Sequence, residues 1–428
     1  MSQTAMHEIP AATASPAPRA AGAPHHLPAV ASLYVTQYLG VGFLSTGLLG
    51  IARQQGLTLT DLALITQLGM VWALKFLWAP AVDRWAPPGR RGHYRRWVMW
   101  TQPLVVLGIL AMLPFGHLGT GLGGLGVVVG LYLLVSATQD VAVDALAARL
   151  FASEGRGRVN GVVVGAQWLG TLVGGGLVVV VYDQFGWTPA VLLLAAAAAL
   201  PYLWLPRLDE ADGHHTAPPQ PLPLASQAVG VFRQPGAVLW GLVTVPLLHI
   251  GIGGAYFLLQ PALVDAGWSL SRVGVVLSVV VAAPAMLAGL ASGHLLDRWG
   301  RRPMLLLTGV GGALSLLPLL PLAAGQAPLG GTVVALTGFV VLNAVANALV
   351  YTVNMDLARP DSAGGDVTLL ASLAMVVYFV GGGFLLALAD SLGYTAVLGL
   401  AGAFYVAATV SGLLFLRRRP DVATARAD

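Results

Sequence analysis

Long apolar stretches constrain the fold of this chain more than any other feature. A helix needs about 20 predominantly apolar residues to cross a bilayer. Stretches of that kind lie near residues 30–51, 61–82, 97–117, 121–148, 160–182, 187–206, 237–263, 272–296, 304–324, 329–357, 367–389 and 394–416. Only 9% of the residues are charged, against roughly 25% in an ordinary soluble domain. Polar groups cannot cover such a surface, so the sequence predicts an all-α membrane protein with twelve transmembrane helices.

Polar segments divide the chain into a tail, two helical regions and a second tail. Residues 1–28 are rich in Ala and Pro, and no apolar core of a signal peptide precedes Leu33. We expect this segment to be a disordered cytoplasmic tail. The expected organisation is then a six-helix bundle over 29–206, a cytoplasmic linker over 207–235, a second six-helix bundle over 236–418 and a cytoplasmic tail over 419–428.

Arginines gather in alternate connections between the predicted helices. The basic connections hold Arg84, Arg90, Arg91, Arg95, Arg96, Arg149, Arg156, Arg158, Arg298, Arg301, Arg302, Arg417, Arg418 and Arg419. The connections between them carry only Arg53 and Arg272. Short cytoplasmic loops collect basic residues, so we expect a multi-pass protein of the inner membrane with both termini in the cytoplasm. This bias accounts for most of the net charge of +4, and no nucleic-acid partner is needed to explain it.

The two halves of the chain repeat each other. Asp83-Arg84-Trp85, after the second apolar stretch, recurs as Asp297-Arg298-Trp299 after the eighth. The run 174–176 of three glycines is followed by Asp183, and the run 381–383 is followed by Asp390 at the same spacing. Matching segments in the same order indicate an internal duplication.

Two fused six-helix bundles form the architecture of the major facilitator superfamily, which this sequence resembles over about residues 33–416. Asp297, Arg298, Arg301 and Arg302 look like the loop motif of that superfamily, with Asp83 and Arg84 at the matching place in the first half. The resemblance implies that these loops latch the two halves together in one state. It also implies a substrate path between the halves, near the middle of the membrane.

Further motifs resemble a narrower branch of transporters. These motifs are 74–80, 93–97, 137–140 and 363–370. Together they resemble the branch that joins muropeptide permeases, acetyl-CoA transporters and the RhtX/FptX family of siderophore permeases. Segments 37–40 and 53–56 look most like the siderophore group, whereas Gly365, Leu370 and 143–145 depart from the pattern. The resemblance implies import of a siderophore or its ferric complex.

Charged residues inside the predicted helices are few. Lys75 is the only lysine of the chain, and it lies within the second apolar stretch. An ionised group at such a depth costs a few kcal/mol, so we expect a partner or an aqueous cavity. Asp140 and Asp144 are four residues apart and share one helix face. We expect Lys75 to pair with one of them, either as a proton-coupling pair that opens during transport or as a permanent structural ion pair.

Polar residues on four predicted helices are candidates for binding the substrate, because the resembled fold lines its cavity with the first, fourth, seventh and tenth helices. They suit a large planar ligand with several hydrogen-bond acceptors. The candidates are Tyr34, Gln37, Tyr38, Gln139, His249, Tyr256, Gln260, Asn343, Asn347 and Asn354. The alternative for the three asparagines and for His249 is a hydrogen bond between neighbouring helices.

Several functional classes lack their sequence signals. The chain has no cysteine, no P-loop and no His-Glu-x-x-His motif. We therefore expect neither an enzyme nor a cofactor or metal site. The prediction is a monomeric secondary transporter, proton-coupled, for a siderophore-like solute. Alternatives are an anhydromuropeptide permease, a drug/proton antiporter, which usually has Gly-Pro where Gly174-Gly175 stands, and an intramembrane enzyme or sensor built on Asp140 and Asp144.

Overall fold

Helices make up all regular structure in the part of the chain that the computed structural model describes. The described residues are 26–89, 92–150, 165–208, 210, 229–359 and 363–419. Eleven helical stretches are long and apolar enough to cross a membrane. The last of them, Asp366–Arg418, contains a break at Gly393, whose φ of 77° is not helical. It therefore comprises two spans, and the prediction of twelve transmembrane helices is confirmed.

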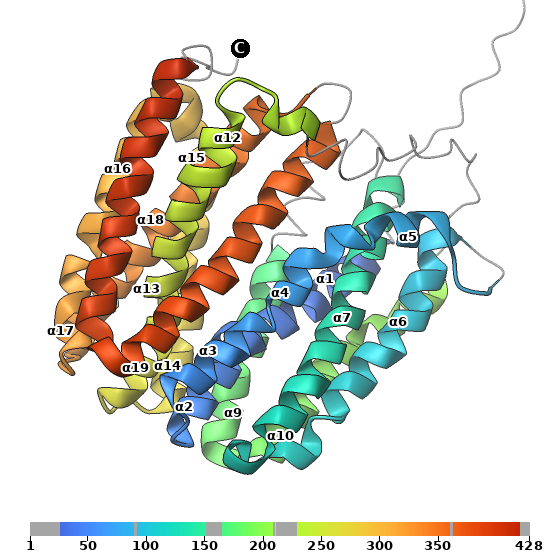
Figure 1. Ribbon diagram of the computed structural model, residues 1–428. Coiled ribbons are helices and arrows are strands. Elements are labelled where there is room, and N and C mark those ends of the chain that lie inside the picture. The colour runs from blue at the N-terminus through green and yellow to red at the C-terminus, as the bar shows by residue number, and fades with distance from the viewer. Residues whose placement is uncertain are drawn as a thin grey trace, which may run out of the picture.

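The first half contains six spans, from α1 to α10 (Figure 1). α1 (Leu27–Gly42) continues through a π-helical turn into α2 (Leu49–Gln54). The second span comprises α3 (Leu59–Gln67), α4 (Met70–Ala73), a 3₁₀ turn at Leu74–Leu77 and α5 (Ala79–Arg84). The remaining elements are α6 (His93–Leu110), α7 (Leu118–Leu150), a π-helical turn at Leu172–Leu177, α9 (Val178–Phe185) and α10 (Trp187–Ala199).

The second half follows the same plan. α12 (Ala237–Leu239) leads through a π-helical turn at Trp240–Thr244 into α13 (Val245–Asp265). α14 (Leu270–Val275) leads through a similar turn at Val276–Val281 into α15 (Ala282–Trp299). The other elements are α16 (Arg301–Ser315), α17 (Leu320–Ala323), α18 (Leu329–Asp356) and α19 (Ala363–Arg418).

Two boundaries differ from those predicted. The first helix begins at Leu27, inside the segment predicted as a tail, because Pro28 fits the first turn of a helix where no N–H donor is needed. Residues 1–25 lie outside the described part. The second span is not one continuous helix, as the apolar stretch suggested. Pro80 cannot donate to the carbonyl four residues earlier and its ring clashes with it, so the α-helix gives way to a 3₁₀ turn before this residue.

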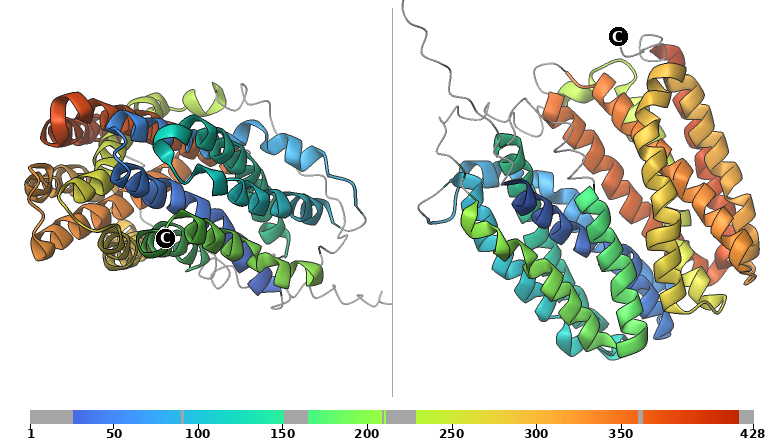
Figure 2. Two further views of the ribbon diagram at one scale, coloured as in Figure 1. Left: turned by 90° about the horizontal axis from the view of Figure 1, so that it is seen from below. Right: turned by 180° about the vertical axis from the view of Figure 1, so that it is seen from behind.

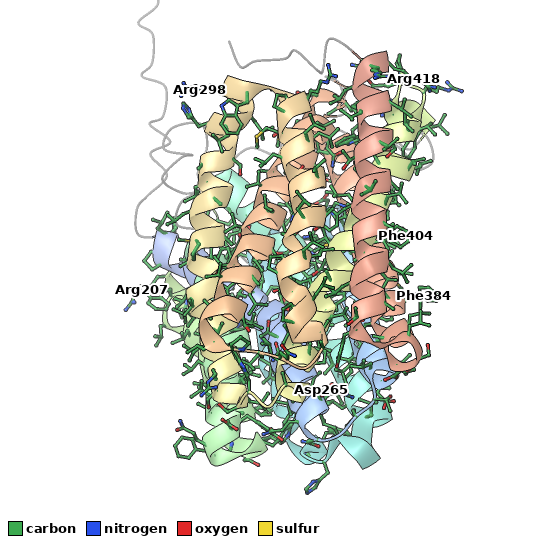
Figure 3. The ribbon with its side chains drawn as sticks, turned by 90° about the vertical axis from the view of Figure 1, so that its left-hand side faces the viewer. Arg207, Asp265, Arg298, Phe384, Phe404 and Arg418 are labelled. Atoms are coloured by element: carbon green, nitrogen blue, oxygen red, sulfur yellow. The ribbon has the colours of Figure 1, made fainter. Side chains whose placement is uncertain are left out.

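The two halves lie side by side as separate groups of helices (Figures 1 and 2). They meet where α9 contacts α14, where α2 contacts α13 and where α3 contacts α19. Arg298 and Arg418 lie at one end of the molecule, which we call the basic end, and Asp265 lies toward the opposite end (Figure 3). α5, which ends at Arg84, also lies at the basic end (Figure 1).

The outer surface of both halves is apolar, whereas glycines bring helices together inside each half. Phe384 is 62% exposed and points outward (Figure 3). Inside the first half, a Cβ on Gly174 would lie 2.1 Å from the carbonyl oxygen of Leu39. In the matching glycine run of the second half, a Cβ on Gly382 would lie 2.8 Å from the carbonyl carbon of Gly253. Both helix pairs therefore pack backbone against backbone, as small residues allow in membranes.

Candidate functional site

An ion pair lies inside the first half. The 3₁₀ turn before Pro80 carries Lys75, and its ammonium group contacts the carboxylate of Asp140 on α7. The Asp140 side chain is 5% exposed and that of Lys75 is 26% exposed. The indole of Trp72 lies 5.6 Å from the Lys75 nitrogen, measured to the ring centroid. The structure thus selects Asp140 as the direct partner among the two carboxylates predicted from the sequence.

Asp144, one turn further along α7, has a different partner. Its carboxylate accepts a hydrogen bond of 2.6 Å from the hydroxyl of Tyr34 on α1, and the residue is exposed. Tyr34 was predicted as a substrate contact, and the structure instead places it in the charged cluster. Three helical segments of the first half therefore meet at one group of side chains, in which one carboxylate is paired with a cation and the other with a phenol.

A cavity of about 380 Å³ lies beside α13, α18 and α19. Its wall combines four aromatic side chains with three asparagines and one histidine. The residues that line it are Trp168, His249, Ile252, Tyr256, Ala285, Val340, Asn343, Ala344, Asn347, Val350, Tyr351, Asn354, Ala371, Ala374, Met375 and Tyr378. Among the described residues, Trp168 is the contribution of the first half, so the described wall is strongly asymmetric.

The structure brings some of the predicted substrate contacts together and leaves others apart. Those that line the cavity are His249, Tyr256, Asn343, Asn347 and Asn354. Those outside its lining are Tyr34, Gln37, Tyr38, Gln139 and Gln260.

Four of the positions outside the cavity are buried between packed helices, and Tyr38 is partly exposed. Gln139 is fully buried and donates to the Gln102 side chain over 2.8 Å. The Cβ of Tyr38 packs beside Gly170, and the amide of Gln260 packs beside Gly50. Gln37 is fully buried on the same helix as Tyr38. A helix face shared with a polar neighbour was therefore not enough to predict contact with the cavity.

The polar groups on α18 are partly held by neighbouring helices. The side-chain oxygen of Asn343 accepts a hydrogen bond of 2.5 Å from the Tyr405 hydroxyl. The side-chain oxygen of Asn354 accepts one of 2.9 Å from the Trp240 indole N–H. Asn347 donates from its amide nitrogen to the backbone carbonyl of Asn343 over 3.0 Å. Hydrogen bonds between helices and contact with the cavity therefore coexist along this stripe.

Charged groups join the two halves at the end opposite the basic loops. Arg53 of the first half forms two hydrogen bonds of 2.7 and 2.6 Å with the carboxylate of Asp265 of the second half. The Tyr394 hydroxyl donates to the same carboxylate over 2.6 Å. These groups form a bidentate ion pair, the geometry in which an arginine binds a carboxylate most strongly.

Two aspartates from the internal repeat bind helix N-termini across the same boundary. Asp390 accepts hydrogen bonds from the backbone N–H groups of Leu59 and Thr60 over 2.9 and 2.6 Å, in the first turn of α3. Asp183 accepts from the backbone and the hydroxyl of Ser271 over 3.2 and 2.7 Å, in the first turn of α14. Each half therefore supplies a carboxylate to unpaired N–H groups of the other half. We call these contacts, with Arg53 and Asp265, the gate contacts.

The loop motifs at the basic end bond within their own halves. Asp83 accepts from the Tyr94 hydroxyl over 2.9 Å, and Arg301 binds Asp356 over 3.0 and 3.2 Å. The remaining motif arginines, Arg84, Arg298 and Arg302, are exposed, and the side chain of Asp297 lies outside the described part. The expected latch between the halves at these motifs is thus not among the contacts described.

Residues 30–427 match one family. The model of the major facilitator superfamily matches residues 30–384 and, in a second match, residues 267–427. The chain belongs to the major facilitator superfamily. It is therefore a multi-pass membrane transporter of a small molecule. Solved superfamily structures share its fold. These include a D-xylose–proton symporter (TM-score 0.68, 14% identity, 93% of this chain and 98% of that chain). They also include an inward-facing bacterial homologue of the lysosomal transporter Spinster (0.66, 15%, 95% and 99%).

Relatives within the superfamily align over shorter segments. The chain is 34% identical over 145 residues to the anhydromuropeptide permease of Escherichia coli K12, over 33% of this chain and 29% of the permease. It is 28% identical over 260 residues to an uncharacterized protein of Haemophilus influenzae, over 58% and 59% of the two chains. The chain thus spans less than two thirds of the length of either relative in these alignments.

Sequence reasoning missed the gate contacts. Asp183 and Asp390 recur at the same spacing after the two glycine runs, but this spacing does not show what they bind. A usable signal was the Thr58-x-x-Asp61 capping box and its counterpart Ser269-x-x-Arg272, which mark the two helix starts that these aspartates contact. Asp265 gave no such signal.

Proposed function

We propose that this superfamily member imports a siderophore, or its ferric complex, across the inner membrane by alternating access, with both termini in the cytoplasm. The observation that supports this proposal is that the gate contacts join the halves at the end opposite the basic loops. If the basic end is cytoplasmic, the described state is closed toward the outside. A solute in the cavity would then be released toward the cytoplasm.

The cavity wall supports a chelator as the substrate. Aromatic rings of Trp168, Tyr256, Tyr351 and Tyr378 provide flat apolar surface. The asparagines of α18 add polar groups, and none of the described residues that line the cavity is an Asp, Glu, Lys or Arg. Siderophores combine apolar or aromatic parts with several oxygen acceptors, which such a wall can accommodate. Its volume of about 380 Å³ falls in the usual range for small-molecule sites.

A second candidate substrate is an anhydromuropeptide. The observation in its favour is the 34% identity with the anhydromuropeptide permease over 145 residues. The sugar rings of such a solute would stack on the same aromatic side chains, and its peptide carbonyls would accept from the asparagines. The two candidates differ in the cell process that depends on them, which makes them separable.

Uptake into proteoliposomes separates these substrates. The reconstituted protein should accumulate a siderophore labelled with radioactive iron, and an excess of unlabelled anhydromuropeptide should not compete. Deleting the gene should slow growth on that siderophore as the sole iron source. Accumulation of labelled anhydromuropeptide, with no siderophore transport across a panel of chelator classes, would instead establish the second candidate.

Proton coupling through Asp140, Asp144 and Lys75 is a separate part of the proposal. Asp140 is buried against Lys75, whereas Asp144 is exposed and bound to Tyr34. A proton arriving at the cluster would release Lys75 from Asp140 and change the contact between α7 and the second span. The two carboxylates would then differ in role because only one neutralises the lysine.

The variant Asp140→Asn tests this coupling. It should abolish uptake driven by a pH gradient, because the neutral amide cannot exchange a proton with Lys75. Exchange of labelled for unlabelled substrate should persist, since exchange needs no net proton movement. Asp61→Asn, on an exposed helix start, is the matched control and should retain both activities. Unchanged gradient-driven uptake by Asp140→Asn would refute the coupling role while leaving the substrate proposal intact.

A further inference from the structure

Two buried amide nitrogens in the cavity wall lack a hydrogen-bond partner. They belong to Asn343, which is 6% exposed, and Asn354, which is 1% exposed. Both residues line the cavity. A buried donor without an acceptor costs about 1–3 kcal/mol, and native proteins keep few of them. A ligand that fills the cavity is the natural source of the missing acceptors.

The opposite atom of each amide is already engaged, which fixes the direction of the nitrogen. The indole N–H of Trp240 can only donate, so the group that faces it over 2.9 Å must be the oxygen of Asn354. The Tyr405 hydroxyl donates to the oxygen of Asn343. Both Tyr405 and Trp240 are buried, at 0% and 1% exposure, and so hold the amides rigidly. Each NH₂ group is therefore left without an acceptor, on a residue that lines the cavity.

The spacing of the two donors sets a length for the ligand. Asn343 and Asn354 are eleven residues apart on α18, which corresponds to three turns and about 16 Å along the helix axis. The lining of the cavity runs along α18 from Val340 to Asn354 and so includes both positions. Between them the same helix presents Asn347, Val350 and Tyr351 to the cavity. The Asn347 nitrogen already donates to a backbone carbonyl, so the unpartnered amide nitrogens of this wall lie at its two distant points.

We infer that the cavity binds an elongated, open-chain solute with an acceptor oxygen near each end. One carbonyl, hydroxamate or carboxylate oxygen would accept from Asn343, and another, about 16 Å away, from Asn354. The part between them would lie along Val350 and Tyr351. This inference deepens the proposed function, because it rests on the cavity being the substrate site, and it selects linear chelators over compact ones.

The test uses linear dihydroxamic acids of increasing chain length. Their binding is measured to the purified protein in lipid nanodiscs. Affinity, measured by calorimetry, should rise steeply once the chain lets the two carbonyls reach both asparagines. Asn343→Asp and Asn354→Asp keep the oxygens that Tyr405 and Trp240 contact but remove the free donors. Each should weaken binding of the long probe about five- to tenfold, as expected for one hydrogen bond. The double variant should show the product of the two effects, since distant sites act additively.

Control variants separate this role from a general loss of structure. Gln326→Glu makes a similar amide-to-carboxylate change at an exposed residue outside the cavity lining and should have little effect. Tyr405→Phe and Trp240→Phe leave the asparagines in place but free them to rotate, and should weaken the long probe while sparing a monohydroxamate. Affinity that is independent of chain length, or Asn343→Asp and Asn354→Asp proteins that bind the long probe normally, would overturn the inference even if siderophore uptake is observed. Conversely, the length dependence would stand if the transported substrate proved to be an anhydromuropeptide.

Discussion

Gly174 shows how one missing side chain sets the distance between two helices. A Cβ at this position would lie 2.1 Å from the Leu39 carbonyl oxygen, whereas a Cβ at Gly126 of α7 would meet no atom within 4 Å. We predict that Gly174→Ala destabilises the protein by about 1–3 kcal/mol, the usual effect of overpacking. Gly126→Ala should be neutral or slightly stabilising. Thermal unfolding in detergent measures both, and equal melting temperatures would contradict the close approach.

Pairing of charges was predictable at the scale of single residues, but the direction of uncharged side chains was not. A lone lysine in an apolar stretch needs a partner, and only a few carboxylates were available, so Asp140 and Asp144 were the natural candidates. Tyr34 was grouped with the substrate contacts because it shares a helix face with other polar residues. Its hydrogen bond to Asp144 depends on how α1 is rotated against α7, and spacing along one helix does not contain that information.

The aspartates that cap helix N-termini in the gate contacts lead to a prediction about α3 and α14. Asp390→Ala removes the carboxylate that accepts from the first N–H groups of α3, and loss of such a cap typically costs about 1 kcal/mol. The state that is open at this end should then gain about fivefold in population, given the thermal energy at 25 °C. Asp183→Ala should act similarly through α14.

The reactivity of a single introduced cysteine measures that shift in population, because the chain has no cysteine of its own. Gln260→Cys, buried beside Gly50 near the gate contacts, should react faster with a membrane-impermeant maleimide when Asp390→Ala is added. Asp61→Ala is the control, since Asp61 caps α3 from within the first half and should leave the rate nearly unchanged. Equal labelling rates in all three backgrounds would show that the caps do not hold the gate closed.

The helices themselves were largely predictable, because the bilayer thickness and apolar length dictate them. The exceptions lie where local chemistry overrides length. Pro80 was visible in the sequence, but an apolar stretch of the right length concealed the break that it imposes on the second span. The π-helical turns at Phe43–Leu48 and Leu172–Leu177 likewise leave no trace in hydropathy.

Movement of the halves against each other gives a prediction for the whole molecule. Oxygens of Thr60 and Asp390 lie 2.6 Å apart across the gate. In a Thr60→Cys, Asp390→Cys protein, a short bifunctional maleimide should join the halves and abolish uptake. Binding of substrate from the basic end should persist, because the cavity is not altered. The single-cysteine proteins treated with the same reagent should still transport, and continued uptake by the cross-linked protein would exclude gate opening as a step.

The reciprocal aspartate contacts carry a consequence for the ancestry of the chain. Asp183 reaches the start of α14 just as Asp390 reaches the start of α3. A contact in which each partner offers the same group to the same site is the isologous interface of a two-fold symmetric dimer. Two copies of a six-helix precursor could therefore have closed against each other before their genes fused. The Lys75–Asp140 pair, present in one half alone, would then be a specialisation acquired after that event.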